Sequence, residues 1–179
     1  MNSNKVSLWG SSYNIDETTQ LDINNVNGEI PMELFRLKNL QFLRIRGNNL
    51  KGNILPQIGD LKNLTTLDLS MNELSGPLPI EIENLKRLRT LNLKSNNLEG
   101  SLPWQISKLK YLTYLDLSKN HFDGHLPSEL KELNKIWYID LSNNNFSGEL
   151  PLDVIKLVSE NNLPLQQITN GNKIIMNIS

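Results

Sequence analysis

The stretch that decides the fold is LTTLDLSMNELSGPLP, which starts at Leu64. Three later stretches repeat its pattern: LRTLNLKSNNLEGSLP from Leu88, LTYLDLSKNHFDGHLP from Leu112 and IWYIDLSNNNFSGELP from Ile136. A further copy, LQFLRIRGNNLKGNIL, precedes them from Leu40. Neighbouring copies are 24 residues apart throughout, and self-similarity at such a fixed period indicates a repeat architecture.

Each copy predicts one short strand, a tight turn and a return segment. In the first half, leucines alternate with other residues, so their side chains lie on one face of a strand. In the second half, apolar residues recur three apart, as at Ile82 and Leu85, which favours a short helix or 3₁₀ turn. Because one unit cannot bury its apolar face alone, the units must stack. The sequence therefore predicts an α/β solenoid whose strands form one parallel sheet.

Three further columns recur with the same period and are interpreted as scaffold. Asparagine follows each strand, where its amide can satisfy backbone groups of the turn; the column is Asn48, Asn72, Asn96, Asn120 and Asn144. Glycine comes four residues later, where a positive φ or a close backbone approach requires it; the column is Gly52, Gly76, Gly100, Gly124 and Gly148. Proline then sets the bend into the return segment, at Pro79, Pro103, Pro127 and Pro151.

The pattern LxxLxLxxNxLxGxIP resembles the plant-type leucine-rich repeat of receptor-kinase ectodomains and polygalacturonase-inhibiting proteins. The resemblance extends from Leu21 to about Leu157. It implies a right-handed superhelix with the parallel sheet on its concave face, and a second short strand in each LxGxIP segment. It also implies a non-catalytic module that binds a protein or peptide on the concave face. The alternative is an inhibitor of an extracellular glycosidase, similar to the polygalacturonase-inhibiting proteins.

The chain is interpreted as a single domain over residues 1–179. Residues 1–17 are expected to form an N-terminal cap, residues 18–157 about six repeats, and residues 158–179 a C-terminal cap or tail. An open solenoid exposes apolar surface at both ends, which caps must cover. The side chains expected to cover the first coil are Val6, Leu8, Trp9 and Ile15.

At the other end, the 24-residue period places the next strand around Leu163 and Leu165, with Pro164 between them. Proline has no N–H to donate to a neighbouring strand, so it is found in edge strands of a sheet. Ile168 occupies the asparagine position of that coil, so the repeat is expected to end there. Residues 174–176 are expected either to fold back as cover or to form a loose tail.

Composition narrows the classes of partner and compartment. The net charge is −1, so nothing favours binding to nucleic acid, and no apolar run reaches the length of a membrane span. The absence of cysteine excludes disulfides and thiolate metal sites. Plant ectodomains of the resembled family usually carry cysteine pairs in both caps. A cytoplasmic protein is therefore expected, with a secreted or cell-surface protein as the alternative if a signal peptide was removed.

Partner-binding residues are expected at outward positions of the main strands that break the common LDLS pattern. Aromatic residues and arginine dominate interface hot spots. The candidates are Phe42, Arg44, Arg46, Lys94, Tyr114 and Tyr138. They predict a basic N-terminal half and an aromatic C-terminal half of the concave face. Ordinary surface variation is the alternative interpretation.

No catalytic, cofactor or metal site is expected, and the chain is interpreted as a protein other than an enzyme. The two histidines, His121 and His125, flank Asp123 in the segment HFDGH. Residues four apart face the same way on a helix, whereas this segment is predicted to be a turn. These positions also vary among the copies, so turn variation is preferred to a metal site.

Overall fold

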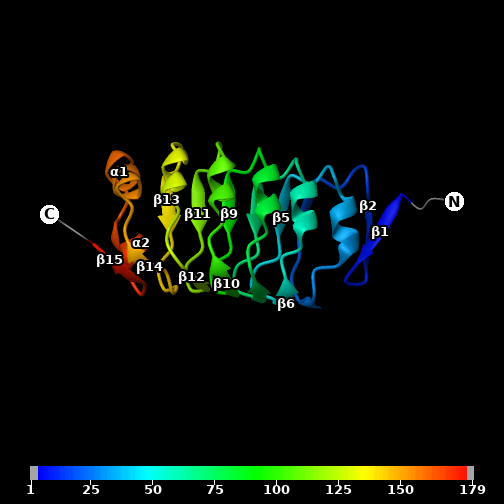
Figure 1. Ribbon diagram of the computed structural model, residues 1–179. Helices are drawn as coiled ribbons and strands as arrows, with labels where there is room; N and C mark the ends of the chain where they lie inside the picture. The colour runs from blue at the N-terminus through cyan, green and yellow to red at the C-terminus, as the bar shows by residue number, and fades with distance from the viewer. Residues whose placement is uncertain (1–3, 177–179) are drawn as a thin grey trace.

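The computed structural model describes residues 4–176, which form a solenoid of stacked coils (Figure 1). The first strand of each coil joins one six-stranded parallel sheet, here called the main sheet. Its strands are β3 (Gln20–Asp22), β5 (Phe42–Arg44), β7 (Thr66–Asp68), β9 (Thr90–Asn92), β11 (Tyr114–Asp116) and β13 (Tyr138–Asp140). Leu43, Leu67 and Leu91 lie opposite one another in the register. The predicted parallel solenoid is confirmed, and its handedness stays a prediction.

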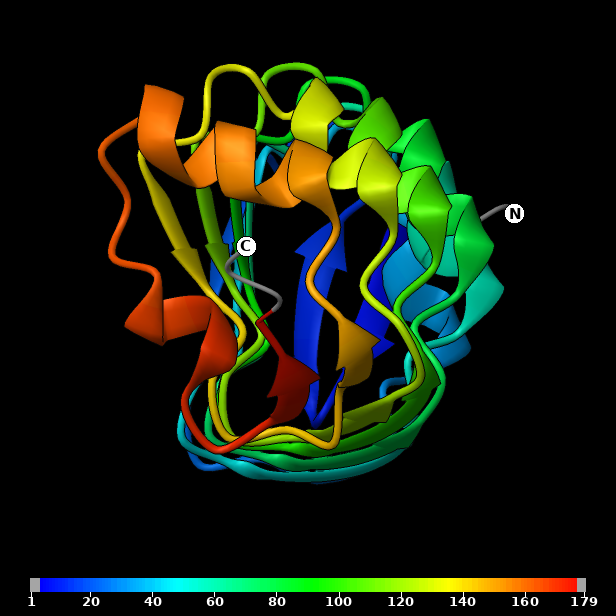
Figure 2. The same ribbon diagram turned by 60° about the vertical axis from the view of Figure 1, so that its left-hand side comes forward.

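A second parallel sheet follows the turn of each coil, as the resemblance implied. Its strands are β4 (Asn27–Gly28), β6 (Asn49–Asn53), β8 (Glu73–Gly76), β10 (Asn97–Ser101) and β12 (His121–Asp123). The return segments are 3₁₀ turns: η1 (Met32–Arg36), η2 (Pro56–Asp60), η3 (Ile80–Asn84), η4 (Trp104–Lys108) and η5 (Ser128–Glu132). The α-helix α1 (Leu152–Glu160) takes the place of a sixth turn and stacks beside η5 (Figure 2).

The core lies between the two sheets and the return turns, and it is built from the repeated apolar columns. Leu67, Leu91 and Leu115 of the main strands have no exposed surface. Phe122 and Phe146 take a leucine position in the last two full coils, and their parallel rings lie 6.1 Å apart. Burying one such side chain stabilises the fold by roughly 1.5–3 kcal/mol.

The asparagine column joins each coil to its neighbour, which confirms its structural interpretation. The Oδ1 atom of Asn96 accepts a hydrogen bond from the backbone N–H of Leu74 at 3.0 Å. Its Nδ2 atom donates to the carbonyl oxygens of Leu69 and Leu93, each at 3.0 Å. One buried side chain therefore satisfies three backbone groups that the turn removes from the sheet ladder.

A β-hairpin packs against the first coil, within the segment predicted to form the N-terminal cap. Strands β1 (Lys5–Leu8) and β2 (Ser11–Asn14) pair antiparallel. Trp9 and Gly10 form the turn with φ values of 45° and 83°. Val6 and Leu8 are buried, while Trp9 and Ile15 pack against the core from its edge. Residues 1–3 of the expected cap lie outside the described residues.

The expectation that the repeat ends at Ile168 is wrong. Pro164 lacks an N–H, and instead of a main strand the chain forms a short helix, α2 (Gln166–Thr169), with Ile168 buried. This turn takes up additional residues, so the asparagine position falls at Asn172. Its Nδ2 donates to the carbonyl of Leu141 at 2.9 Å, and its Oδ1 accepts from the N–H of Phe146 at 3.2 Å.

The chain after Asn172 adds one more strand to the solenoid. Strand β15 (Lys173–Ile175) pairs parallel with β14 (Ser147–Glu149). Of the three apolar residues expected as cover or tail, Ile174 packs against the core, whereas Ile175 and Met176 are exposed. Residues 177–179 of the expected C-terminal segment lie outside the described residues. Across residues 4–176, no helix combines the length and the apolar character that crossing a bilayer requires.

Candidate functional site

The six residues predicted to bind a partner fall into two groups on the main sheet. Phe42 and Arg44 form the first group on β5. The guanidinium of Arg44 lies 3.2 Å from Oδ2 of Asp22 and 3.9 Å from Oδ2 of Asp68, and its Cζ atom lies 4.9 Å from the centre of the Phe42 ring. Two carboxylates therefore flank the Arg44 charge, and this end of the sheet is less basic than the sequence suggested.

The other four candidates, Arg46, Lys94, Tyr114 and Tyr138, line one hollow of about 310 Å³. This hollow, here called the main-sheet hollow, extends over the ends of the middle main strands. The remaining lining residues are Ser70, Met71, Asn92, Ser95, Asp116 and Lys119. The structure thus brings together side chains that lie up to four coils apart in the sequence, because the repeat places equivalent positions side by side.

Three aromatic side chains in contact form the C-terminal wall of this surface; we call Tyr114, Trp137 and Tyr138 the aromatic cluster. The rings of Tyr114 and Tyr138 are stacked, 4.4 Å apart and 5° from parallel, because β11 and β13 place them opposite each other. Trp137 meets both rings edge-on at 5.9 and 6.1 Å. Trp137 is nevertheless 64% exposed, so the cluster presents a large apolar area to solvent.

The tyrosine hydroxyls are held in the neutral form. Burial raises the pKa of both Tyr114 and Tyr138, and the nearby carboxylate of Asp116 raises the pKa of each further. The hydroxyl of Tyr138 donates to Oδ2 of Asp140 at 3.4 Å. At neutral pH both phenols are protonated, and because the Tyr138 proton is already donated to Asp140, its oxygen can still accept a hydrogen bond beside an apolar ring surface.

The aspartates of the LDLS pattern serve the turn. Oδ1 of Asp116 accepts hydrogen bonds from the N–H of Ser118 at 3.0 Å and from its hydroxyl at 2.6 Å. Asp68 and Ser70 make the same two bonds. The second oxygen of Asp116 faces Nζ of Lys94 at 3.7 Å. These carboxylates are buried and partnered, which agrees with their interpretation as common features of the repeat.

Sequence reasoning missed three residues of this surface: Met71, Lys119 and Trp137. Met71 and Lys119 directly precede an asparagine of the column and adopt the left-handed conformation, with φ values of 58° and 57°. This backbone turns both side chains toward the hollow, which strand alternation alone does not predict. The signal for Trp137 was available, because an exposed tryptophan directly precedes Tyr138 at the start of a main strand.

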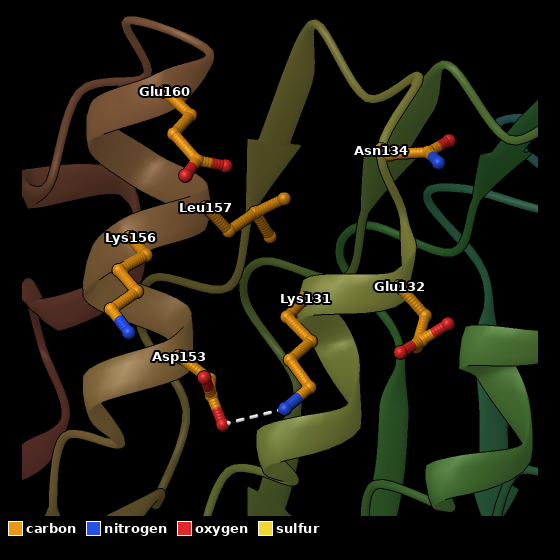
Figure 3. A pocket seen from close by; sticks show the side chains of 7 residues that line it. All are labelled: Lys131, Glu132, Asn134, Asp153, Lys156, Leu157 and Glu160. Atoms are coloured by element: carbon orange, nitrogen blue, oxygen red, sulfur yellow. Dashed lines mark hydrogen bonds and ion pairs between the residues drawn. The ribbon is translucent and has the colours of Figure 1, made fainter.

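A second depression, of about 320 Å³, lies between η5 and α1 on the return side (Figure 3). Three of the charged side chains that line it take part in ion pairs between coils: Lys131 lies 2.9 Å from Asp153, and Glu132 pairs with a lysine outside the depression. The same arrangement recurs at Lys110 and Glu132, also at 2.9 Å. Such exposed pairs contribute about 0–1 kcal/mol each. We interpret this crevice as the gap between two neighbouring return elements.

The histidines do not form a metal cluster with other ligands. His121 and Asp123 lie on β12, and His125 follows the glycine turn; all three are exposed. Across residues 4–176, no group of three or more histidine, cysteine or acidic side chains is arranged to hold a metal ion.

Comparison with known proteins identifies the repeat. The family model described as Leucine Rich Repeat matches five segments that together cover more than half of the chain: residues 39–61, 63–85, 87–109, 111–133 and 135–157. No curated protein matches the sequence.

Solved structures of plant receptors are similar to this chain. The leucine-rich-repeat ectodomain of the plant membrane receptor kinase GASSHO1/SCHENGEN3 from Arabidopsis thaliana, in complex with CASPARIAN STRIP INTEGRITY FACTOR 2, is 33% identical, with a TM-score of 0.76 over 87% of this chain and 18% of that one. The plant peptide hormone receptor RGFR1 in complex with RGF2 is 30% identical, with a TM-score of 0.78 over 91% and 26%. The chain thus spans about a fifth to a quarter of these two proteins.

Shorter structures match over more of their own length. A chain of the BIR3–SERK2 complex from Arabidopsis thaliana is 33% identical, with a TM-score of 0.69 over 76% of this chain and 71% of that one. These similarities overturn the cytoplasmic expectation: the matched proteins are ectodomains of plant membrane receptors, which indicates a cell-surface or extracellular protein. The absence of cysteine led to the wrong compartment, because the N-terminal hairpin packs on the first coil without any disulfide. These matches give no support to the glycosidase-inhibitor alternative.

Proposed function

Because this chain belongs to the plant-type leucine-rich-repeat family, we propose that it recognises a peptide or an extended protein segment through the main sheet. Several similar ectodomains were solved with a bound peptide or a partner protein, and this kind of module is typically non-catalytic. A protein-interaction role fits this family, whereas the binding surface and its residues are our proposal. Function on a shared scaffold depends on a few variable side chains.

The main observation in support of the proposal is the aromatic cluster. Trp137 is 64% exposed and is in contact with two stacked tyrosines. Exposed aromatic side chains gathered beside polar groups are typical of interface hot spots. Tyr114 and Tyr138 also line the main-sheet hollow, so a ligand can contact rings and polar groups together.

Selection from a phage-displayed library of random dodecapeptides tests this function and requires no natural partner. Binding of selected peptides is then measured by isothermal titration calorimetry with the wild type and with the variant Tyr114→Ala/Tyr138→Ala. Since hot-spot truncations cost about 2 kcal/mol or more, we expect the affinity to fall by roughly thirtyfold.

The matched control is Trp104→Ala, because Trp104 is an exposed aromatic residue on the return side, 45% accessible. It should leave the affinity within about twofold of the wild type. Circular dichroism melting of each variant checks that the fold is retained. If the selected peptides bind the double tyrosine variant as tightly as they bind the wild type, the proposed binding surface is wrong.

A further inference from the structure

The main sheet carries two different kinds of side chain along its two edges, by which we mean the N-terminal and the C-terminal ends of its strands. Tyr114 and Tyr138 are the first residues of β11 and β13. Arg46 and Lys94 lie two residues beyond the ends of β5 and β9, and Lys119 lies three residues beyond the end of β11. The rings and the cations therefore line opposite edges of the same main-sheet hollow.

The cationic edge is only partly neutralised. Lys94 is the one cation of the hollow with a carboxylate partner, the Asp116 oxygen at 3.7 Å. The guanidinium of Arg46 has the Met71 sulfur at 3.6 Å as its hydrogen-bond partner. Within residues 4–176, no ion pair involves Arg46 or Lys119. Three cationic side chains and the buried carboxylate of Asp116 line the hollow, so cations outnumber carboxylates in its lining.

We propose that the main-sheet hollow binds a peptide segment in which acidic and aromatic side chains alternate. This inference rests on the proposed function and specifies the chemistry of the ligand. In an extended peptide, successive side chains point to opposite sides. A peptide that crosses the main strands between the two edges places every second side chain toward Arg46, Lys94 and Lys119. Where the peptide passes β11 and β13, the intervening side chains then lie against the aromatic cluster.

The chemistry of each edge matches one half of that alternation. Lysine and arginine donate charge-assisted hydrogen bonds to carboxylates, and these bonds are stronger than those between neutral groups. Aromatic rings prefer stacked or edge-to-face contact with other rings, and Trp137, which is 64% exposed, offers a ring for such contacts. Charge complementarity also favours fast association with an acidic segment.

The test compares peptide selections on three proteins: the wild type, Arg46→Glu/Lys119→Glu, and the control Lys62→Glu/Lys86→Glu. The two double variants change the net charge equally. Lys62 and Lys86 are exposed in the turns that follow the return segments, away from the hollow. The wild type and the control should both enrich peptides in which aspartate or glutamate adjoins an aromatic residue. Peptides selected on the wild type should bind Arg46→Glu/Lys119→Glu at least about tenfold more weakly than they bind the wild type. Their affinity for the control should lie within about twofold of the wild-type value.

Each other outcome overturns the inference in a distinguishable way. Selected peptides that compete for the main sheet but show no acidic excess contradict this inference and leave the proposed function standing. Failure to select any peptide that depends on Tyr114 and Tyr138 contradicts both. Binding of heparin that is lost in Arg46→Glu/Lys119→Glu, without acidic peptides in the selection, would assign the hollow to an acidic polysaccharide instead. Melting temperatures of the variants exclude loss of folding as the cause.

Discussion

At the residue scale, one asparagine per coil links neighbouring coils through the backbone. Asn96 is 6% exposed and bonds to Leu69, Leu74 and Leu93. This role was predictable because the asparagine recurs where the chain must leave the strand. Lys119 shows the opposite case: its sequence position was visible, whereas its direction depends on a left-handed backbone with φ of 57°. The sequence signal for that conformation lies in other copies, where Gly47 and Asn143 take the same position and belong to the residue types that favour it.

Replacing Asn96 with alanine should therefore destabilise the protein. Three backbone groups lose their partner in a buried site, and one such loss costs about 1–3 kcal/mol. Urea unfolding should give a decrease of at least that size in the free energy of unfolding. Asn97→Ala is the matched control, because Asn97 is exposed, and it should stay within about 0.5 kcal/mol. Equal stability of the two variants would contradict the structural role.

At the element scale, the return turns differ in how closely they approach one another. Gly59 of η2 lies so near η3 that a Cβ atom there would meet the carbonyl oxygen of Glu81 at 2.5 Å. Ser107 occupies the equivalent position of η4, and its buried hydroxyl has no hydrogen-bond partner among residues 4–176. The period predicted these turns, but it did not predict the different spacing, which depends on packing between coils.

Alanine at these two positions should have opposite effects. Gly59→Ala overpacks the contact with η3 and should destabilise by about 1–3 kcal/mol. Ser107→Ala removes an unpaired buried polar group and should be neutral or stabilise by about 1 kcal/mol. Thermal unfolding of both variants measures the difference. A loss of stability in Ser107→Ala comparable to that in Gly59→Ala would show that the two turns pack alike.

The C-terminal coil marks the limit of what the period predicts. Strand positions from β5 to β13 follow from the 24-residue step, whereas α2 does not, because Pro164 and the residues after it replace the strand with a helical turn. Four of the six candidate binding residues line the main-sheet hollow, because the repeat places equivalent positions side by side. Their role in binding stays a prediction.

At the scale of the whole molecule, each coil touches mainly its neighbours, so damage should remain local. Asn172→Ala removes the bonds to Leu141 and Phe146 and should release the last coil. Hydrogen exchange followed by mass spectrometry should become faster over residues 163–176 and stay unchanged in β5, β7 and β9. Faster exchange throughout the solenoid would instead indicate one fully cooperative unit.

The same one-dimensional architecture extends the binding surface along the sheet, from the coil of β5 to β13. The aromatic cluster lies on the last two main strands, while the cations extend back to the second coil. A ligand that uses both must therefore lie along the solenoid across several strands. We consequently expect an extended ligand rather than a side chain inserted in a single pocket.

The most direct test of recognition by the main sheet is nuclear magnetic resonance with a spin-labelled peptide taken from the library selection. Paramagnetic broadening of backbone amides locates the bound peptide without mutating the protein. We expect the strongest broadening at β9, β11 and β13 and at the residues just beyond them, including Ser95 and Lys119. Broadening centred on η2 to η5, with the main strands unaffected, would contradict recognition by the main sheet.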